Sequence, residues 1–139
     1  MKTYIGTKII SAVPSVGGRD VPVSGYAVTY SDGYESWSPK EAFEAAYQPT
    51  DAMSFGHAIV MLKAGKRVAR AGWNGKGMFV YLVPPASYPV QTGAAKAFFG
   101  ENSLVPYNAY LAIKNVDDTV STWVPSINDV LADDWTLLD

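Results

Sequence analysis

A glycine-rich segment from Gly72 to Gly77 is the first place where the sequence could bind a ligand. Its three glycines let the backbone approach a bound molecule, Trp73 supplies an aromatic ring, and Lys76 could meet a phosphate as a point charge. The same residues also suit a tight hairpin turn with nothing bound, because Asn-Gly is the favoured pair there. The segment lacks the ending of a phosphate-binding P-loop and the glycine spacing of dinucleotide folds. The pattern alone therefore leaves both interpretations open.

A second candidate is an aromatic surface around Trp123. Strand alternation places Trp123 on the same face as Ser121, which is the more polar face of its predicted strand. On the neighbouring predicted strand, Tyr110 and Lys114 point away from the core and set an aromatic ring beside a cation. Such a surface suits a nucleobase, since stacking on an aromatic side chain contributes about 1–3 kcal/mol per base. The alternative is that Trp123 packs beneath a loop or against a partner chain.

Charged residues are distributed unevenly, although the formal net charge is only −2. One stretch contains five cations and no acid: Lys63, Lys66, Arg67, Arg70 and Lys76. Six aspartates crowd the C-terminal end: Asp117, Asp118, Asp129, Asp133, Asp134 and Asp139. We expect no general affinity for DNA or RNA, which depends on many phosphate contacts. The basic stretch could meet a small phosphate-bearing ligand, or it could be an ordinary solvated surface.

The amino-acid composition excludes most kinds of catalytic site. The chain has no cysteine, which excludes thiolate nucleophiles and cysteine zinc sites, and His57 is its single histidine. A catalytic triad would have to use His57, and a histidine metal site would have no second histidine. Carboxylate-only chemistry is compatible with the composition, but the sequence has no paired-carboxylate or phosphate-loop motif. We therefore predict no enzyme, no cofactor and no metal, and interpret His57 as a surface or interface residue.

The 139 residues fit one ordinary domain, or one domain with a small module attached. No basic segment leads into an apolar stretch behind Met1, and no apolar run is long enough to span a membrane. We expect a cytoplasmic protein that does not bind membranes. The predicted class is α+β, with a boundary in the polar, proline-containing linker at residues 48–51.

Residues 1–48 predict a small module of strand, β-hairpin and helix. Tyr4 to Ala12 is β-like, and the alternation from Tyr26 to Trp37 passes through a turn at Ser31-Asp32-Gly33. Ser38 has the position of a helix N-cap, with proline next and glutamate three residues on. We expect this helix to end near Tyr47.

Residues 53–139 predict a small antiparallel sheet with a packed N-terminal helix and a short C-terminal helix. The first helix runs from Ser54 to about Ala64 and is apolar on two sides, which favours self-association. The expected strands are Arg67 to Trp73, Met78 to Val83, Tyr107 to Asn115, Thr119 to Val124 and Trp135 to Leu138. Asn74-Gly75 and Asp117-Asp118 mark hairpin turns, Ser126 to Ala132 suits a short helix with capping-box spacing, and Pro84 to Pro106 is one long loop.

Several segments of this second part resemble one known family in order and spacing. They are Met53-Ser54-Phe55, Leu62 to Lys66, Ala69 to Phe79, Val105-Pro106-Tyr107, Trp123 and Asp129 to Trp135. Together they are similar to the Thoeris anti-defence family of the second type. The resemblance implies a phage protein that binds cyclic ADP-ribose isomers made by bacterial TIR-domain proteins and does not degrade them. Some members also sequester cyclic dinucleotides. Members form homo-oligomers, commonly tetramers, with ligand pockets between subunits.

The resemblance also implies roles for individual residues. Trp73, Phe79 and Trp123 would stack on bases. Strand alternation, and not the resemblance, adds Tyr110 to the expected ligand contacts. Asn74 and Gly75 would offer polar and backbone groups. Ser126 or Asp129 would contact a ribose hydroxyl, and Arg67, Arg70 and Lys76 would meet phosphate.

The first part of the chain precedes the point, near Met53, where the shortest members of that family begin. Tyr4 to Lys8 and Gly33 to Lys40 resemble a short phage protein module of unassigned role. An alternative function for the whole chain is a phage structural or protein-interaction module that binds no nucleotide and uses its aromatic residues as interface anchors. A hydrolase of the cyclic signal would need a base or metal that the sequence does not offer.

Overall fold

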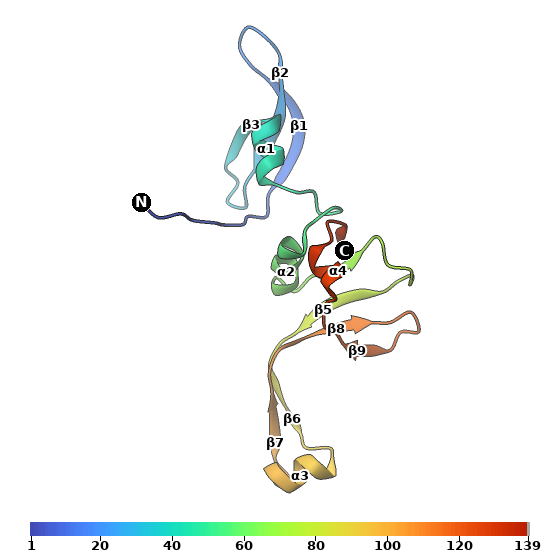
Figure 1. Cartoon of the computed structure of the whole chain (residues 1–139). Coiled ribbons are helices and arrows are strands. Elements are labelled where there is room, and N and C mark those ends of the chain that lie inside the picture. The colour runs from blue at the N-terminus through green and yellow to red at the C-terminus, as the bar shows by residue number, and fades with distance from the viewer. Residues whose placement is uncertain (139) are drawn as a thin grey trace. The chain divides into compact units, whose positions relative to one another are not determined.

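The computed structural model describes residues 1–138, and the chain divides between Pro49 and Thr50 into an N-terminal and a C-terminal unit (Figure 1). Both units combine antiparallel strands with helices, which confirms the predicted α+β class. Among residues 1–138, no helix has the length and apolarity that crossing a lipid bilayer requires.

A three-stranded antiparallel sheet in the order β1-β2-β3 forms the N-terminal unit. Its elements are β1 (Ser11–Gly17), β2 (Val23–Thr29), β3 (Glu35–Pro39) and α1 (Lys40–Ala46). The predicted turn at Ser31-Asp32-Gly33 is confirmed, and Gly33 takes the left-handed φ of 87° that this turn needs. The predicted strand from Tyr4 to Ala12 is wrong, because the ladder with β2 begins only at the Ser11–Thr29 pair and runs to Gly17.

Helix α1 packs on one face of this sheet through a row of aromatic rings. Phe43 stacks on Tyr26 with ring centroids 4.1 Å apart, and Tyr47 follows Phe43 at 5.0 Å. The predicted N-cap Ser38 is wrong, because Pro39 occupies the cap position and no side chain caps the helix. Strand β3 stays paired with β2 through Pro39, so the backbone remains extended one residue longer than the capping pattern indicates.

A five-stranded antiparallel sheet in the order β10-β4-β5-β8-β9 organises the C-terminal unit. The sheet and its two helices comprise α2 (Phe55–Lys63), β4 (Arg67–Arg70), β5 (Phe79–Val83), β8 (Tyr110–Lys114), β9 (Val120–Thr122), α4 (Ile127–Leu131) and β10 (Trp135–Leu138). The sequence predicts an element at each of these places, with ends that differ by a few residues. The last strand lies at the sheet edge, where Trp135 pairs with Arg70 of β4.

Helix α2 covers one face of this sheet and contributes to its core. Ser54 caps the helix, since its Oγ accepts from the backbone N of His57 at 3.3 Å, and Gly65 follows the end of the helix at φ 83°. Both ends agree with the sequence prediction. The buried cluster consists of Met53, Ala58, Met61, Leu62, Val68, Val80, Ile113 and Trp135. Burying one large aliphatic side chain stabilises the fold by about 1.5–3 kcal/mol, so this cluster is the main source of stability in the unit.

Residues 84–109, called the arm below, project from the sheet as a hairpin, and the long loop predicted from Pro84 to Pro106 is wrong (Figure 1). The arm contains β6 (Ala86–Pro89), α3 (Gly93–Phe99) and β7 (Leu104–Tyr107), and β6 pairs with β7. The predicted strand from Tyr107 to Asn115 is therefore divided between β7 and β8. Prolines, which disfavour a central strand, are tolerated in this two-stranded ribbon because both of its strands are edges.

Residues 71–78 make a longer connection between β4 and β5 than the tight hairpin predicted at Asn74-Gly75. Only the Val68–Val80 pair joins β4 to β5. Beyond Arg70 the chain leaves the ladder, and the Trp73 ring packs with its centroid 5.4 Å from that of Trp135. The segment therefore packs Trp73 against the aromatic residues of the core instead of forming the short turn.

Candidate ligand-binding site

The two faces of the five-stranded sheet separate the residues that the sequence singles out. Directly paired residues share a face, so the buried Val80–Ile113 pair belongs to the face that α2 covers. The adjacent Phe79–Lys114 pair belongs to the opposite face. We call this opposite face the open face and define it by Arg67, Phe79, Tyr81, Tyr110 and Lys114.

Three tryptophans and Phe55 form an aromatic cluster on the covered face. The ring centroid of Trp135 lies 5.3 Å from that of Phe55, 5.4 Å from that of Trp73 and 6.0 Å from that of Trp123. Trp135 is fully buried, and the other three rings are half-buried around it. Edge-to-face ring pairs contribute about 0.5–1.5 kcal/mol beyond the area that they bury, so the cluster stabilises this end of the sheet.

Trp123 does not share a surface with Tyr110 and Lys114, and the prediction that it does is wrong. Its backbone N donates to the carbonyl oxygen of Leu111 at 2.7 Å, which continues the β8–β9 pairing by one step. That step puts the Trp123 ring on the covered face, 6.2 Å from the ring of Phe55. The alternative that the sequence left open, packing beneath a loop or against a partner chain, did not include this position either. The other part of the prediction holds, since Tyr110 and Lys114 lie on the open face.

A hydrogen-bonded network of one arginine and two aspartates borders the tryptophan cluster. Arg70 donates from Nε to Asp134 at 2.9 Å and from Nη1 to Oδ1 of Asp129 at 3.0 Å. The indole Nε1 of Trp73 donates to the same Asp129 oxygen at 3.3 Å. Asp129 Oδ2 accepts from the backbone N of Ser126 at 3.0 Å, and Ser126 Oγ accepts from the backbone N of Asp129 at 3.1 Å. The predicted capping box is therefore confirmed, and it engages the side chains of both Ser126 and Asp129.

The network keeps both carboxylates ionised. Burial acts to raise the pKa of Asp129, but hydrogen bonds from the Ser126 backbone and from Arg70 outweigh it, and the pKa falls below its ordinary value of 3.8. The pKa of Asp134 is also lowered, chiefly by its hydrogen bond with Arg70. The same two contacts raise the pKa of the Arg70 guanidinium. Because its charge is matched by these two carboxylates, Arg70 positions protein groups rather than offering an unpaired cation.

The same network anchors the glycine-rich segment at residues 71–78. The backbone N of Gly72 donates to Oδ2 of Asp134 at 2.8 Å, and a Cβ added at Gly72 would lie within 2.8 Å of that oxygen. Any larger residue at this position would therefore force the Asp134 carboxylate to shift. Asn74 and Lys76 are exposed, whereas Gly75 is half-buried. The segment presents polar groups at the surface from a backbone held by Asp134.

On the open face, two cations flank one aromatic ring. The guanidinium carbon of Arg67 lies 4.9 Å from the ring centroid of Phe79, and the Lys114 Nζ lies 5.8 Å from the same centroid. Lys114 also pairs with Asp118 at 2.7 Å and thereby lowers the pKa of that carboxyl. Within residues 1–138, Arg67 has no carboxylate partner. Its planar guanidinium group lies over the ring, where a cation–π contact is favourable.

Tyr81 and Tyr110 extend the aromatic surface of the open face. The Tyr81 ring centroid lies 6.0 Å from that of Phe79, and Tyr110 is exposed opposite Val83 at the end of β5. Such a surface can stack a planar base, and the flanking cations can meet phosphate oxygens. The sequence prediction of ligand contacts includes Phe79, Tyr110 and Arg67 but omits Tyr81. Its alternation with Phe79 along the strand was the signal that could have identified it.

Comparison with known proteins finds a family match for the C-terminal unit. A family model described as the Thoeris anti-defense 2-like domain matches residues 53–138. The chain is also similar to the protein called Thoeris anti-defense 2 from Bacillus phage SP01, with 41% identity over 87 residues. That alignment covers 62% of this chain and 94% of the relative. Residues 1–52 lie outside the family match, so the N-terminal unit is an addition to the shared domain.

Proposed function

We propose, because this chain belongs to the Thoeris anti-defense 2-like family, that it is a phage anti-defence protein which binds a cyclic nucleotide immune signal and sequesters it intact. The similarity to a protein named for that role supports the anti-defence part of the proposal. The ligand class is supported by one observation above all, the placement of Phe79 between Arg67 and Lys114 on the open face.

The chemistry of the open face suits cyclic ADP-ribose isomers and cyclic dinucleotides. Both combine planar bases with negatively charged phosphates. Phe79, Tyr81 and Tyr110 offer rings for a base, and Arg67 offers a guanidinium that no carboxylate within residues 1–138 neutralises. A guanidinium can contact two phosphate oxygens at once, which favours Arg67 over Lys114 as the main phosphate ligand.

The glycine-rich segment is the second part of the proposed site. Asn74 and Lys76 are exposed there and could contact ribose or phosphate, and the half-buried edges of Trp73 and Trp123 could contact a base. Gly75 could contribute backbone groups. For Arg70, Ser126 and Asp129 we propose positioning roles, because a ligand could use their side chains only by breaking the capping box or the ion pairs.

Sequestration without cleavage is supported by the state of the carboxylates in the C-terminal unit. Asp129 and Asp134 both accept from Arg70, and Asp118 pairs with Lys114. A carboxylate that acts as a general base needs a pKa raised toward neutrality, whereas these pKa values are lowered. We therefore assign none of the three as a catalytic base.

We further propose a homo-oligomer, a tetramer as the resemblance implies, with the ligand bound between subunits. The arm supports this proposal. Val90 and Val105 are buried in the arm, whereas Phe98 is 83% exposed and Leu104 is 62% exposed. Apolar side chains grouped on a projecting element are typical of subunit interfaces. A second copy that covered the arm and part of the open face would also enclose a ligand there.

Titration calorimetry tests the proposed function, with a cyclic ADP-ribose isomer made by a TIR enzyme and then with a 3′,3′ cyclic dinucleotide. A sequestering protein must compete with a receptor, so we expect nanomolar affinity for at least one ligand, about −12 kcal/mol. Heating the complex and analysing the released ligand should return it chemically unchanged. A cleaved product would instead indicate a hydrolase. Binding of neither ligand would favour the alternative of a protein-interaction module.

A further inference from the structure

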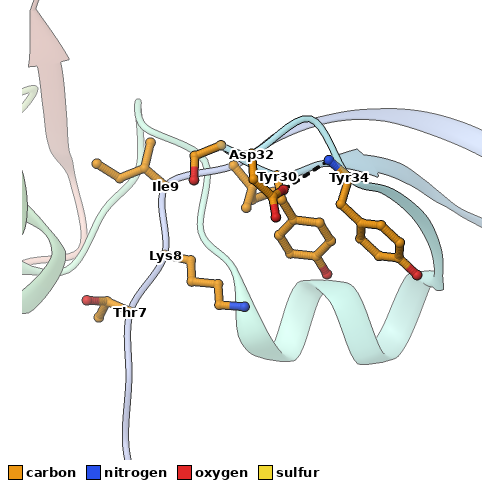
Figure 2. Close-up of a pocket in the computed structure, with 8 residues that line it drawn as sticks. Thr7, Lys8, Ile9, Tyr30, Asp32 and Tyr34 are labelled. Atoms are coloured by element: carbon orange, nitrogen blue, oxygen red, sulfur yellow. Dashed lines mark hydrogen bonds between the residues drawn. The ribbon is translucent and has the colours of Figure 1, made fainter.

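The N-terminal unit contains an open pocket of about 580 Å³ that the proposed function does not use (Figure 2). Its lining residues are Thr7, Lys8, Ile9, Ile10, Tyr30, Ser31, Asp32 and Tyr34. All of them lie outside the family match at residues 53–138. The volume is within the usual range for small-molecule sites, about 300–1,000 Å³.

Two sequence segments singled out for their resemblance to a phage module meet at this pocket. Thr7 and Lys8 come from the segment Tyr4 to Lys8, and Tyr34 comes from the segment Gly33 to Lys40. The first segment forms one wall as an extended chain before β1, and the turn between β2 and β3 forms the other. The fold therefore combines residues some 25 positions apart in the sequence into one lining.

Internal hydrogen bonds hold the turn that forms the second wall. The backbone N of Tyr30 donates to the carbonyl of Tyr34 at 2.9 Å, and the N of Gly33 donates to the carbonyl of Tyr30 at 2.9 Å. Asp32 Oδ1 accepts from the backbone N of Tyr34 at 2.9 Å. These bonds fix the positions from which the tyrosine side chains project, so this wall is preorganised for a ligand.

Aromatic rings in the pocket offer a stacking surface. The rings of Tyr30 and Tyr34 lie 5.9 Å apart at 28°, side by side as Figure 2 shows. Tyr30 is half-buried and also contacts Tyr47, the residue that follows α1. The pKa of Tyr47 is raised first by burial and then by Tyr30. Tyr34 is 65% exposed, so its ring can receive a planar group.

Polar groups beside the rings include one cation and one carboxylate. The Nζ of Lys8 lies 5.0 Å from the centroid of the Tyr30 ring, and within residues 1–138 it pairs with no carboxylate. Asp32 uses one oxygen to accept from Tyr34 and can accept from a ligand N–H or O–H with the other. A ligand that satisfies this lining has a planar ring with a hydrogen-bond donor and a negatively charged group.

We propose that this pocket binds a nucleoside monophosphate, with the base stacked on Tyr34, the phosphate at Lys8 and a base or sugar donor at Asp32. The inference is independent of cyclic nucleotide binding, since no residue of the C-terminal unit takes part. It gives the N-terminal unit a binding function of its own.

The test is NMR titration of the ¹⁵N-labelled full chain with adenosine 5′-monophosphate, with adenosine and ribose 5-phosphate as separate arms. We expect the monophosphate to shift the amide signals of residues 7–10 and 30–34. Each partial ligand should bind at least about fivefold more weakly, because it lacks either the stacked ring or the charge. Equal binding of the monophosphate and adenosine would overturn the role of Lys8.

Matched variants separate the pocket from general surface effects. Lys8→Ala should weaken monophosphate binding about threefold. Lys2→Ala removes the same charge from a nearby position that does not line the pocket, and it should leave binding unchanged. Tyr34→Ala should weaken binding about tenfold, with the exposed Tyr4→Ala as its control. The proposal is overturned if each pair of variants behaves alike, if no amide shifts at millimolar ligand, or if the shifts map to the open face instead.

Discussion

The guanidinium of Arg70 and the carboxylate of Asp129 meet at 3.0 Å and so join strand β4 to the first turn of helix α4. Asp129 also caps that helix and accepts from the indole of Trp73. One side chain therefore links an inner strand of the sheet, a helix start and the aromatic cluster. This relationship explains why a buried acid lies next to the proposed site without belonging to a reaction.

We expect Asp129→Asn to lower the free energy of unfolding by about 2 kcal/mol, because an amide cannot accept all the hydrogen bonds that the carboxylate accepts from Arg70, Trp73 and Ser126. Urea denaturation followed by tryptophan fluorescence measures the change. Asp133→Asn is the matched control, since Asp133 is exposed just beyond the same helix. Equal effects of the two substitutions would contradict the network.

The pairing of Asp134 with Arg70 should make stability depend on pH. The pKa of Asp134 is lowered in the folded state from its ordinary value of 3.8, so the unfolded chain binds the proton more readily. The stabilisation is thus fully present above the unfolded pKa and is lost as pH falls through the folded pKa.

The corresponding measurement compares the wild-type chain with Asp134→Asn in urea between about pH 6 and pH 3. The wild type should be the more stable protein at the upper pH, and the difference should shrink as pH falls below about 3.8. A difference that stays constant over this range would show that the ionised carboxylate does not contribute through Arg70.

Phe79 should contribute to ligand affinity by stacking. Phe79→Leu keeps an apolar side chain on the open face but removes the ring, so we expect cyclic nucleotide affinity to fall about tenfold with little loss of stability. Arg67→Gln should weaken the same affinity and reduce its dependence on salt concentration. Lys63→Gln is the control, because Lys63 is exposed on α2 and the open face does not include it.

Trp123 should contribute to stability, in contrast to Phe79, which should contribute to ligand affinity. Trp123→Ala should lower the free energy of unfolding by about 2–3 kcal/mol, because the ring packs on Phe55, Trp73 and Trp135. If the assembled variant kept its ligand affinity within a factor of about two, stacking of Trp123 on a base would be ruled out. Titration calorimetry on a variant whose assembled molar mass has been confirmed separates a loss of ligand affinity from a loss of stability.

The arm should be required for assembly. Replacing two of its exposed apolar side chains, Phe98→Ser with Leu104→Ser, should lower the molar mass measured by light scattering after gel filtration while circular dichroism stays unchanged. Ile5→Ser, at a fully exposed position of the N-terminal segment, is the control. An unchanged mass in the double variant would exclude the arm as the subunit interface.

Local patterns in the sequence predicted the elements that depend on neighbours along the chain. The Ser54 cap and Gly65 end of α2, the capping box of α4, and the glycine turn between β2 and β3 all agree with the structure. These features agree because the groups that form them lie within four residues of one another. The resemblance of several segments to a known family also identified the C-terminal domain, and the family model matches the same part of the chain.

Tertiary packing decided the features that local patterns left open or misplaced. Trp123 lies on the covered face, where its neighbours come from α2, β10 and the segment before β5. Alternation along a single strand does not reveal contacts with other elements. The arm forms a hairpin because β6 pairs with β7, and α3 separates the two strands in the sequence.

The amino-acid sequence by itself determined the α+β class, the absence of cysteine chemistry and the ends of the well-capped helices, because these depend on composition or on contacts between close neighbours. Only the tertiary structure decided that Arg70 is paired, that Arg67 and Lys114 flank Phe79, and that Lys8 lies over Tyr30. The reason is physical: whether a charge is neutralised or available depends on distances between residues that only the folded chain brings together.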